Sequence, residues 1–451
     1  MRAGIPLFVV LALVCTAGHS RANGRFPEAG QIVVSSVDPK MIVARTTFGL
    51  LISHDRGATW DWVCESAVGG GFGIQDPMVG ITATKSILIS AFDGLFVGQS
   101  DACDWHSASS VFAAAHPVDV AVRPDDPSSA VVVTSAFASS VDDAGTPGFL
   151  SKVYATTNSG ADWAPIGVLD PSIAPLTIDI APSNPHRLYV SATRQIGANV
   201  SGLLLVSEDD GAHWVERSVP TIAAEGVFIG AVDPVREGVV YIRTLSTTTS
   251  RLLVTTDFGA TFREIFHAFT LTGFAISADG SKVYLGGPGG GLNVASRDDY
   301  VFREVNRLKV KCLAYAHGEL YACSNDASTG QALLLGVSND DGVTFRPLAH
   351  FDSIRGPIAC ASGSGAKCVS EWPLIRMTLP LGGAPDGGAP NAEVVSDAGA
   401  SEAPARKASG CTVATNRAGL GSGKLASILA AVAALFLSRI VGRRPCPPPY
   451  G

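Results

Sequence analysis

A short motif that returns seven times constrains the fold of this 451-residue chain more than any other feature. Its pattern is Ser/Thr-x-Asp-x-Gly-x-Thr-Trp/Phe, and its first copy occupies residues 53–60. The copies begin at Ser53, Gly98, Thr156, Ser207, Thr255, Ser296 and Ser338, of which those at Gly98 and Ser296 are degraded. Successive copies start 41 to 58 residues apart, which is close to the roughly 40–50 residues of one propeller blade.

The motif has a physical interpretation as a hairpin corner. Asp and Ser oxygens accept hydrogen bonds from turn amides, Gly supplies a positive φ, and the aromatic ring packs beneath the next strand. We therefore assign the motif residues a structural role. They are Ser53, Asp55, Gly57, Trp60, Trp105, Asn158, Gly160, Trp163, Ser207, Asp209, Gly211, Trp214, Asp257, Gly259, Phe262, Ser338, Asp340, Gly342 and Phe345.

Five good copies at this spacing resemble the Asp-box, or BNR, repeat of sialidases, sortilin-type receptors, plant-type photosystem II assembly factors and xyloglucanases. The resemblance covers roughly residues 30–350 and implies a sialidase-like β-propeller. In those families the boxes lie away from the catalytic or binding residues, so the resemblance implies little about function.

The residues between the boxes predict four short strands per repeat. Apolar runs such as 32–34, 41–44 and 50–52 precede the first box, and the same order returns at 118–122, 130–134 and 152–156. No stretch between residues 30 and 378 shows helical periodicity over three turns. The prediction is an all-β propeller of seven box-bearing blades over residues 23–379, with an all-β solenoid as the rival. Residues 357–361, 368–372 and 374–379 resemble three further strands, which could form an eighth blade with residues 25–27.

Both ends of the chain carry targeting features. Residues 1–22 have the pattern of a secretory signal peptide, with Arg2, an apolar run and a small-x-small site ending at Ala22. Residues 380–410, rich in Ala, Gly, Pro and Ser, predict a flexible linker. Residues 411–451 contain Cys411, an apolar helix-forming run at 425–437 and an arginine cluster.

That order of linker, Gly-Cys, marginal transmembrane helix and arginines resembles the MYXO-CTERM sorting signal of myxobacterial surface proteins. The resemblance implies processing and attachment at Cys411, and display at the cell surface or outer membrane of a Gram-negative bacterium. The late Cys446 departs from the usual arginine-rich end. The alternative is a plain membrane anchor with cytoplasmic arginines.

Six cysteines in the repeat region predict disulfides, which export permits. Cys312 and Cys323 are symmetric about His317-Gly318, so a two-residue hairpin turn would place them opposite each other. A Gly/Ser turn separates Cys360 from Cys368, and elimination pairs Cys64 with Cys103. Metal ligation is the weaker alternative, because no pair has metal-finger spacing.

Signatures of catalysis are missing. The sialidase Arg-Ile-Pro motif is absent, and Asp-box xyloglucanases use two propellers where this chain has length for one. No zinc-protease, serine-hydrolase or phosphate-loop motif occurs, and a net charge of −7 gives no reason to expect nucleic acid.

The sequence therefore predicts a non-catalytic module, without cofactor or metal, that binds a glycan or protein ligand at the cell envelope. The insert at 135–150 is a candidate contact loop. The first alternative is a glycoside hydrolase with two carboxylates facing each other in the central channel. The second is an envelope assembly or stability factor.

Overall fold

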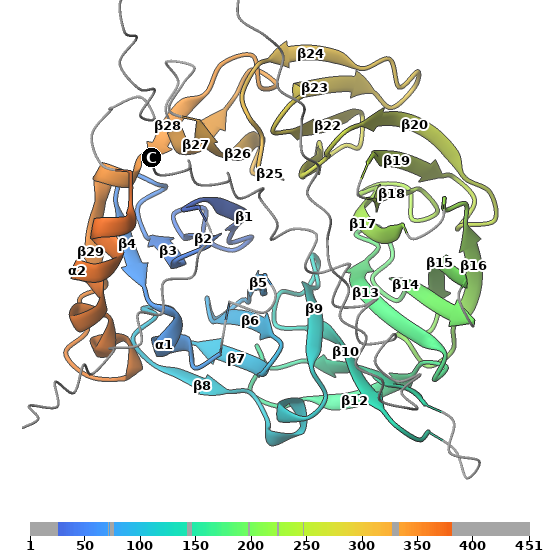
Figure 1. The fold of residues 1–451 in the computed structure, drawn as a ribbon, viewed down its shortest axis with the longest axis horizontal. Coiled ribbons are helices and arrows are strands. Elements are labelled where there is room, and N and C mark those ends of the chain that lie inside the picture. Colours follow the sequence, from blue (N-terminus) through green and yellow to red (C-terminus); the bar gives the residue numbers. More distant parts are fainter. Residues whose placement is uncertain are drawn as a thin grey trace, which may run out of the picture.

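The computed structural model describes residues 26–380, apart from residues 71, 73–75, 142–146, 197–198, 223–224, 247 and 327–332. Seven antiparallel sheets stand around one axis, and each is built from four consecutive strands (Figure 1). The described part of the chain is therefore a seven-bladed β-propeller, as the motif spacing predicted.

Each blade takes four antiparallel strands in chain order from one contiguous piece of chain, and blade 1 gains a fifth strand from beyond blade 7. Blade 1 holds β1 (Ala29–Val34), β2 (Ile42–Thr46), β3 (Gly49–Ser53) and β4 (Trp60–Val63). Blade 2 holds β5 (Met78–Ile81), β6 (Ile87–Ala91), β7 (Gly94–Gly98) and β8 (Trp105–Ser107). Blade 3 holds β9 (Pro117–Val122), β10 (Ala130–Ala138), β11 (Gly148–Thr156) and β12 (Ala164–Val168). Blade 4 holds β13 (Ile173–Ile180), β14 (Leu188–Ile196), β15 (Asn199–Ser207) and β16 (Val215–Val219).

The remaining blades repeat this plan. Blade 5 holds β17 (Gly226–Val232), β18 (Val240–Leu245), β19 (Ser250–Thr255) and β20 (Arg263–Ala268). Blade 6 holds β21 (Gly273–Ile276), β22 (Lys282–Gly287), β23 (Gly291–Ser296) and β24 (Arg303–Asn306). Blade 7 holds β25 (Cys312–Ala316), β26 (Glu319–Asp326), β27 (Leu333–Ser338) and β28 (Arg346–Ala349). Short helical turns are α1 (Glu65–Val68), η1 (Ser110–Ala113), η2 (Phe351–Ser353) and η3 (Ser364–Lys367).

The two middle strands of a blade form its core because neighbouring blades cover both of their faces. In blade 1 every residue of β2 and β3 is buried, which explains why these strands are continuous apolar runs rather than alternating ones. Outer strands such as β12 and β20 have no fully buried residue. The seven boxes lie in the turns between the third and fourth strands, and the turns between the first and second strands lie at the same end of the ring. We call this end the box face.

Side chains on the innermost strands join neighbouring blades. The Gln31 side chain donates to the carbonyl of Val79 and accepts from its N–H. Thr177 Oγ1 accepts from the N–H of Ile229 at 3.0 Å. These bonds satisfy backbone groups that would otherwise be left unpaired at the centre of the ring.

The ring closes differently from the prediction. After blade 7, β29 (Ile354–Pro357) lies parallel to β4 as a fifth, outer strand of blade 1. Residues 368–379, predicted as strands, instead form the helix α2 (Cys368–Thr378), which packs at the rim beside β29 and β4 (Figure 1). The eighth blade, which the sequence had left open, is not formed, and the strands suggested for residues 368–372 and 374–379 are wrong. Phe26 lies outside any strand and is 55% exposed.

The segment after β29 needs no partner strand, because a helix satisfies its backbone hydrogen bonds internally. Cys368, Trp372, Ile375 and Leu379 follow helical spacing and face the propeller, with Trp372 packed 5.2 Å from Trp62. Apolar residues at the intervening positions hide this period in the sequence.

The structure contains three disulfides, one of which has the predicted pairing. Cys312–Cys323 joins directly opposite residues of β25 and β26 across the His317-Gly318 turn, where both residues have positive φ. The predicted pairs Cys64–Cys103 and Cys360–Cys368 are wrong. The observed bridges are Cys64–Cys368 and Cys103–Cys360, which attach the C-terminal segment to blades 1 and 2. Local spacing could not reveal them because their partners are 304 and 257 residues apart.

Several predictions lie outside the described residues. They are the signal peptide ending at Ala22, the linker beyond Pro380, and the sorting signal with Cys411 and its apolar helix. Within residues 26–380 as described, none of the helices has the length and apolar character needed to cross a membrane.

Candidate functional site

The box turns share one hydrogen-bond pattern. In the first box the Ser53 hydroxyl donates to Asp55 Oδ1 at 2.8 Å and accepts from the N–H of Gly57 at 2.8 Å. Asp55 also accepts from the N–H of Thr59 at 2.8 Å and from its hydroxyl at 2.5 Å. The boxes at Thr156, Ser207, Thr255 and Ser338 repeat the bond from the fifth residue to the first.

Two consecutive residues of each clear box adopt positive φ. In the first box these are Arg56 at 65° and Gly57 at 82°. The degraded boxes hold a single such residue, Ala102 or Tyr300, where the others have glycine. Their turns thus tolerate the lost Gly at the cost of one strained residue each.

The box carboxylates accept hydrogen bonds from residues of their own turns. The hydroxyl and N–H of Thr261 lower the pKa of Asp257 to about 2. Thr344 likewise lowers the pKa of Asp340 to about 2, and the N–H and ring of His213 do so for Asp209. Such ionised, hydrogen-bonded groups are suited to hold turns and not to donate protons.

The box aromatics are not equally buried. Trp60 is 1% exposed, and its Nε1 donates to the carbonyls of Gly57 and Leu348. Trp214, by contrast, is half-buried, and its Nε1 has no hydrogen-bond partner among the described residues. Trp163 is half-buried as well, so the box tryptophans differ in how far they pack beneath the next strand.

Two carboxyl groups lie between innermost strands beside the channel. Asp119 on β9 accepts from the N–H of Val120 at 2.8 Å and from that of Ile178 in blade 4 at 3.0 Å. Burial raises the pKa of Asp119 to about 7 against these bonds, and the charge of Asp179 raises it further. Burial also raises the pKa of Asp179, on β13, to about 6.

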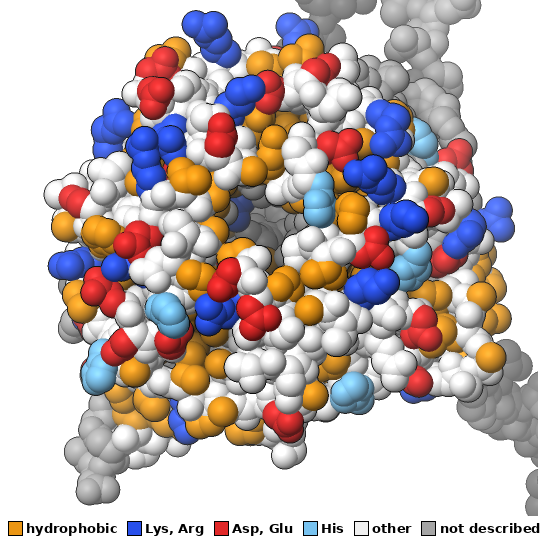
Figure 2. Space-filling view, turned by 180° about the vertical axis from the view of Figure 1, so that it is seen from behind, with side chains coloured by type: hydrophobic (Ala, Val, Ile, Leu, Met, Phe, Trp, Pro, Cys, Tyr) orange, Lys and Arg blue, Asp and Glu red, His pale blue; other side chains and the backbone are white. Residues whose placement is uncertain are grey.

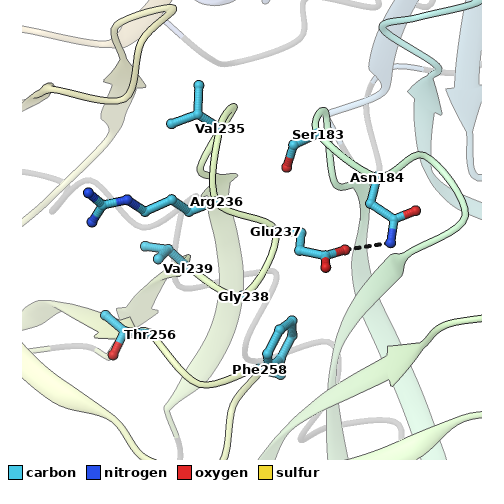
Figure 3. Close-up of a pocket in the computed structure, with 9 residues that line it drawn as sticks. All are labelled: Ser183, Asn184, Val235, Arg236, Glu237, Gly238, Val239, Thr256 and Phe258. Atoms are coloured by element: carbon cyan, nitrogen blue, oxygen red, sulfur yellow. Dashed lines mark hydrogen bonds between the residues drawn. The ribbon is translucent and has the colours of Figure 1, made fainter.

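A groove of about 660 Å³ lies on the box face, between blades 4 and 5 (Figure 3). Blade 4 contributes the turn before β14, and blade 5 contributes the turn before β18 together with its box. The lining residues are Ser183, Asn184, Val235, Arg236, Glu237, Gly238, Val239, Thr256 and Phe258. We call this surface the blade 4–5 groove.

The floor of the blade 4–5 groove is fixed by contacts across the two blades. Glu237 Oε2 accepts from Arg187 Nε at 2.9 Å and from Asn184 Nδ2 at 2.5 Å. Although partial burial opposes it, these bonds hold the pKa of Glu237 below its usual value. The Arg187 guanidinium stacks 4.3 Å from the ring centre of Phe258.

Phe258 makes this packing possible through its backbone. Its φ is 59°, which is rare for a bulky residue. Its ring lies so close to Gly238 that a Cβ there would approach it to 2.9 Å. The turn opposite is held by Asp233, which accepts from the N–H groups of Val235 and Arg236.

The rim of the groove offers unused groups to a ligand. Arg236 is exposed, points away from Glu237 in Figure 3, and its guanidinium has no partner among the described residues. The Ser183 and Thr256 hydroxyls are likewise exposed and unengaged by described neighbours, while Val235 is 51% exposed. The groove can thus contact polar, apolar and anionic parts of a ligand.

None of the groove residues was singled out in the sequence. The available signals were the Asn184-Pro185 and Asp233-Pro234 turns, which recur before second strands. The predicted contact loop at 135–150 is in part strand, because β10 reaches Ala138 and β11 starts at Gly148. Phe137 and Phe149 pair near its tip with ring centres 5.8 Å apart.

Figure 2 shows one face of the molecule, hollowed near its centre, with positive and negative side chains intermixed. Such a surface favours no polyanion. Among the described residues no group of three or more His, Cys, Asp or Glu is arranged to hold a metal ion.

Comparison with known proteins supports the fold alone. No family model and no curated protein matches the sequence. Among solved structures, an ancestral GH74 enzyme is 11% identical over 71% of this chain and 46% of its own, with a TM-score of 0.51. A puromycin-hydrolyzing peptidase of Mycobacterium tuberculosis is 13% identical over 75% and 55%, with a TM-score of 0.50. The chain thus spans about half the length of these two proteins, and their shared feature with it is the propeller.

Proposed function

We propose that this protein is an exported, surface-displayed propeller that binds a glycan or protein ligand without catalysis, and that the ligand occupies the blade 4–5 groove. The observation that carries the proposal is the combination of a fixed floor with an unengaged rim. The fixed floor requires no ordering on binding, so only the rim side chains lose conformational entropy when a ligand is bound.

The carboxylate of the groove argues for binding rather than hydrolysis. Glu237 is ionised and held by Arg187 and Asn184, so it is a poor proton donor. The box aspartates recur at one position of the repeat, and they accept hydrogen bonds within their own turns.

Export is supported by the three disulfides, which persist in oxidising compartments. Attachment through Cys411 and membership of the Asp-box class rest on sequence resemblance, and both belong to the proposal. A Cys411→Ser variant should lose surface display if the attachment is correct, as surface biotinylation would measure.

The binding test compares three proteins on arrays of polysaccharides, sialylated glycans and peptides. Arg236→Gln should weaken binding of the retained ligand at least about tenfold, as expected for a lost charged hydrogen bond. Arg346→Gln, an exposed arginine on the outer strand of blade 7, is the matched control and should bind as the wild type does. Equal binding by all three proteins would place the ligand elsewhere.

A glycoside hydrolase is the second candidate, and the carboxyl pair Asp119 and Asp179 favours it, because raised pKa values suit a general acid. The engagement of both Asp119 oxygens by backbone N–H groups weighs against it. Sugar released from any array member, and lost in Asp119→Asn and Asp179→Asn, would establish the hydrolase and overturn the binding module.

A further inference from the structure

Helix α2 carries apolar side chains on both of its sides. One side packs on blade 1 through Cys368, Trp372 and Ile375. The other side exposes Val369, Leu374 and Met377 at 60%, 64% and 75%, beside an exposed Pro373. We call these four residues the α2 stripe. In a helix their spacing places them on one continuous face.

The charges around the α2 stripe are distributed unevenly. Lys367 precedes the helix and Arg376 lies in its last turn, and neither side chain has an ion-pair partner among the described residues. Among the acids near α2, Glu371 accepts from the Ser66 hydroxyl at 2.5 Å and Asp61 pairs with Arg355. The exposed Asp352 lines the hollow between α2 and the propeller together with Trp372 and Arg376, on the side away from the α2 stripe. An apolar face flanked by free cations is typical of a helix that lies on an anionic membrane.

The position of α2 in the chain adds a second argument. The propeller ends directly after α2, and 71 residues follow Pro380, including the apolar run at 425–437 and Arg439, Arg443 and Arg444. Attachment at Cys411 and a plain membrane anchor at 425–437 would each leave fewer than 50 residues of chain between α2 and the membrane.

We infer that the α2 stripe is a lipid-contacting surface that seats the rim of blade 1 on an anionic membrane. This goes beyond ligand binding in the blade 4–5 groove and does not depend on it. The stripe lies on a helix fixed by the Cys64–Cys368 bridge, so contact with lipid would also set the orientation of the propeller.

Flotation with lipid vesicles tests the inference on the protein ending at Pro380, which retains every blade, β29 and all three disulfides and lacks the apolar run. We expect it to float with phosphatidylglycerol vesicles and much less with phosphatidylcholine vesicles. The Leu374→Glu/Met377→Glu variant should bind at least about tenfold less, because two charges replace two buried apolar groups. Lys367→Gln should lower binding to anionic vesicles about fivefold.

Phe269→Glu is the control, since Phe269 is 77% exposed but lies after blade 5, away from α2. It should float as the wild type does. Unchanged melting temperatures would show that every variant is folded. Failure of the wild type to float, equal flotation of the stripe variant, or a dimer in solution that this variant abolishes would each overturn the inference.

Discussion

Two tryptophans at the same position of the box should contribute very differently to stability. Trp60 is fully buried and its ring N–H bonds to blade 1 and blade 7, whereas Trp214 is half-buried and its ring N–H is unsatisfied. We expect Trp60→Ala to lower the free energy of unfolding by about 3–5 kcal/mol, and Trp214→Ala by less than half of that. Denaturant titration of both variants measures the difference, and equal losses would contradict the structure.

The titration of single carboxyl groups predicts an acidic stability optimum. The box aspartates have lowered pKa values, so the stability they give is present above pH 4 and lost as the pH falls toward 2. Asp119 and Asp179 have raised pKa values, so their contribution is complete below pH 4 and lost as the pH rises through about 6 to 7. Stability should therefore peak near pH 4.

Asp119→Asn isolates one of these groups, because asparagine does not titrate. The variant should lose much of the decline between pH 4 and 7, to which one carboxyl contributes at most about 1.4 kcal/mol per pH unit. Melting temperatures measured from pH 3 to 8 give the slope, which is informative even if the variant is less stable overall. A slope identical to that of the wild type would show that the pKa of Asp119 is the same in the folded and unfolded states, against the raised pKa expected here.

At the scale of elements, the disulfides predict where the protein opens. The Cys64→Ser/Cys368→Ser variant should lose about 4 kcal/mol, because with Cys103–Cys360 intact that bridge closes a loop of about 50 residues. Its helix α2 should also become accessible to protease. The Cys312→Ser/Cys323→Ser variant should lose about 3 kcal/mol and leave residues 354–380 protected. Cleavage sites identified by mass spectrometry distinguish the two, and early cleavage within blade 7 in the first variant would contradict this assignment.

The sequence could predict features that depend on residues close together in the chain, but not features that depend on residues far apart. The boxes, the strand rhythm and the Cys312–Cys323 hairpin depend on residues a few positions apart, so local chemistry was enough. The bridges of Cys64 and Cys103 depend on how the ring closes, which no local pattern encodes. The blade 4–5 groove joins Asn184, Glu237 and Phe258 from two blades, and its shape depends on a positive φ at a phenylalanine that no propensity would predict.

For the whole molecule, the manner of closure is the decisive feature. The four antiparallel strands of every blade come from one contiguous piece of chain, so the first and last blades share none of them, and β29 joins blade 1 as a fifth, parallel strand. The ring is instead held by contacts between blades 1 and 7, such as Trp60 with the Leu348 carbonyl, and by the segment 354–380 that is bonded covalently to blades 1 and 2. Removing that segment should leave all seven blades formed and loosen one junction.

A protein ending at Ser353, with Cys64→Ser and Cys103→Ser to avoid free thiols, tests this directly. We expect it to fold, since no blade loses one of its four strands, but to exchange amide hydrogens faster in β4 and β28 than the intact protein does. Blades 3 to 5 lie across the ring and should keep their protection, because local opening follows local contacts. The full-length Cys64→Ser/Cys103→Ser variant separates the effect of the thiols from that of the deletion. Uniformly faster exchange in all blades would show instead that the closing segment stabilises the ring as one cooperative unit.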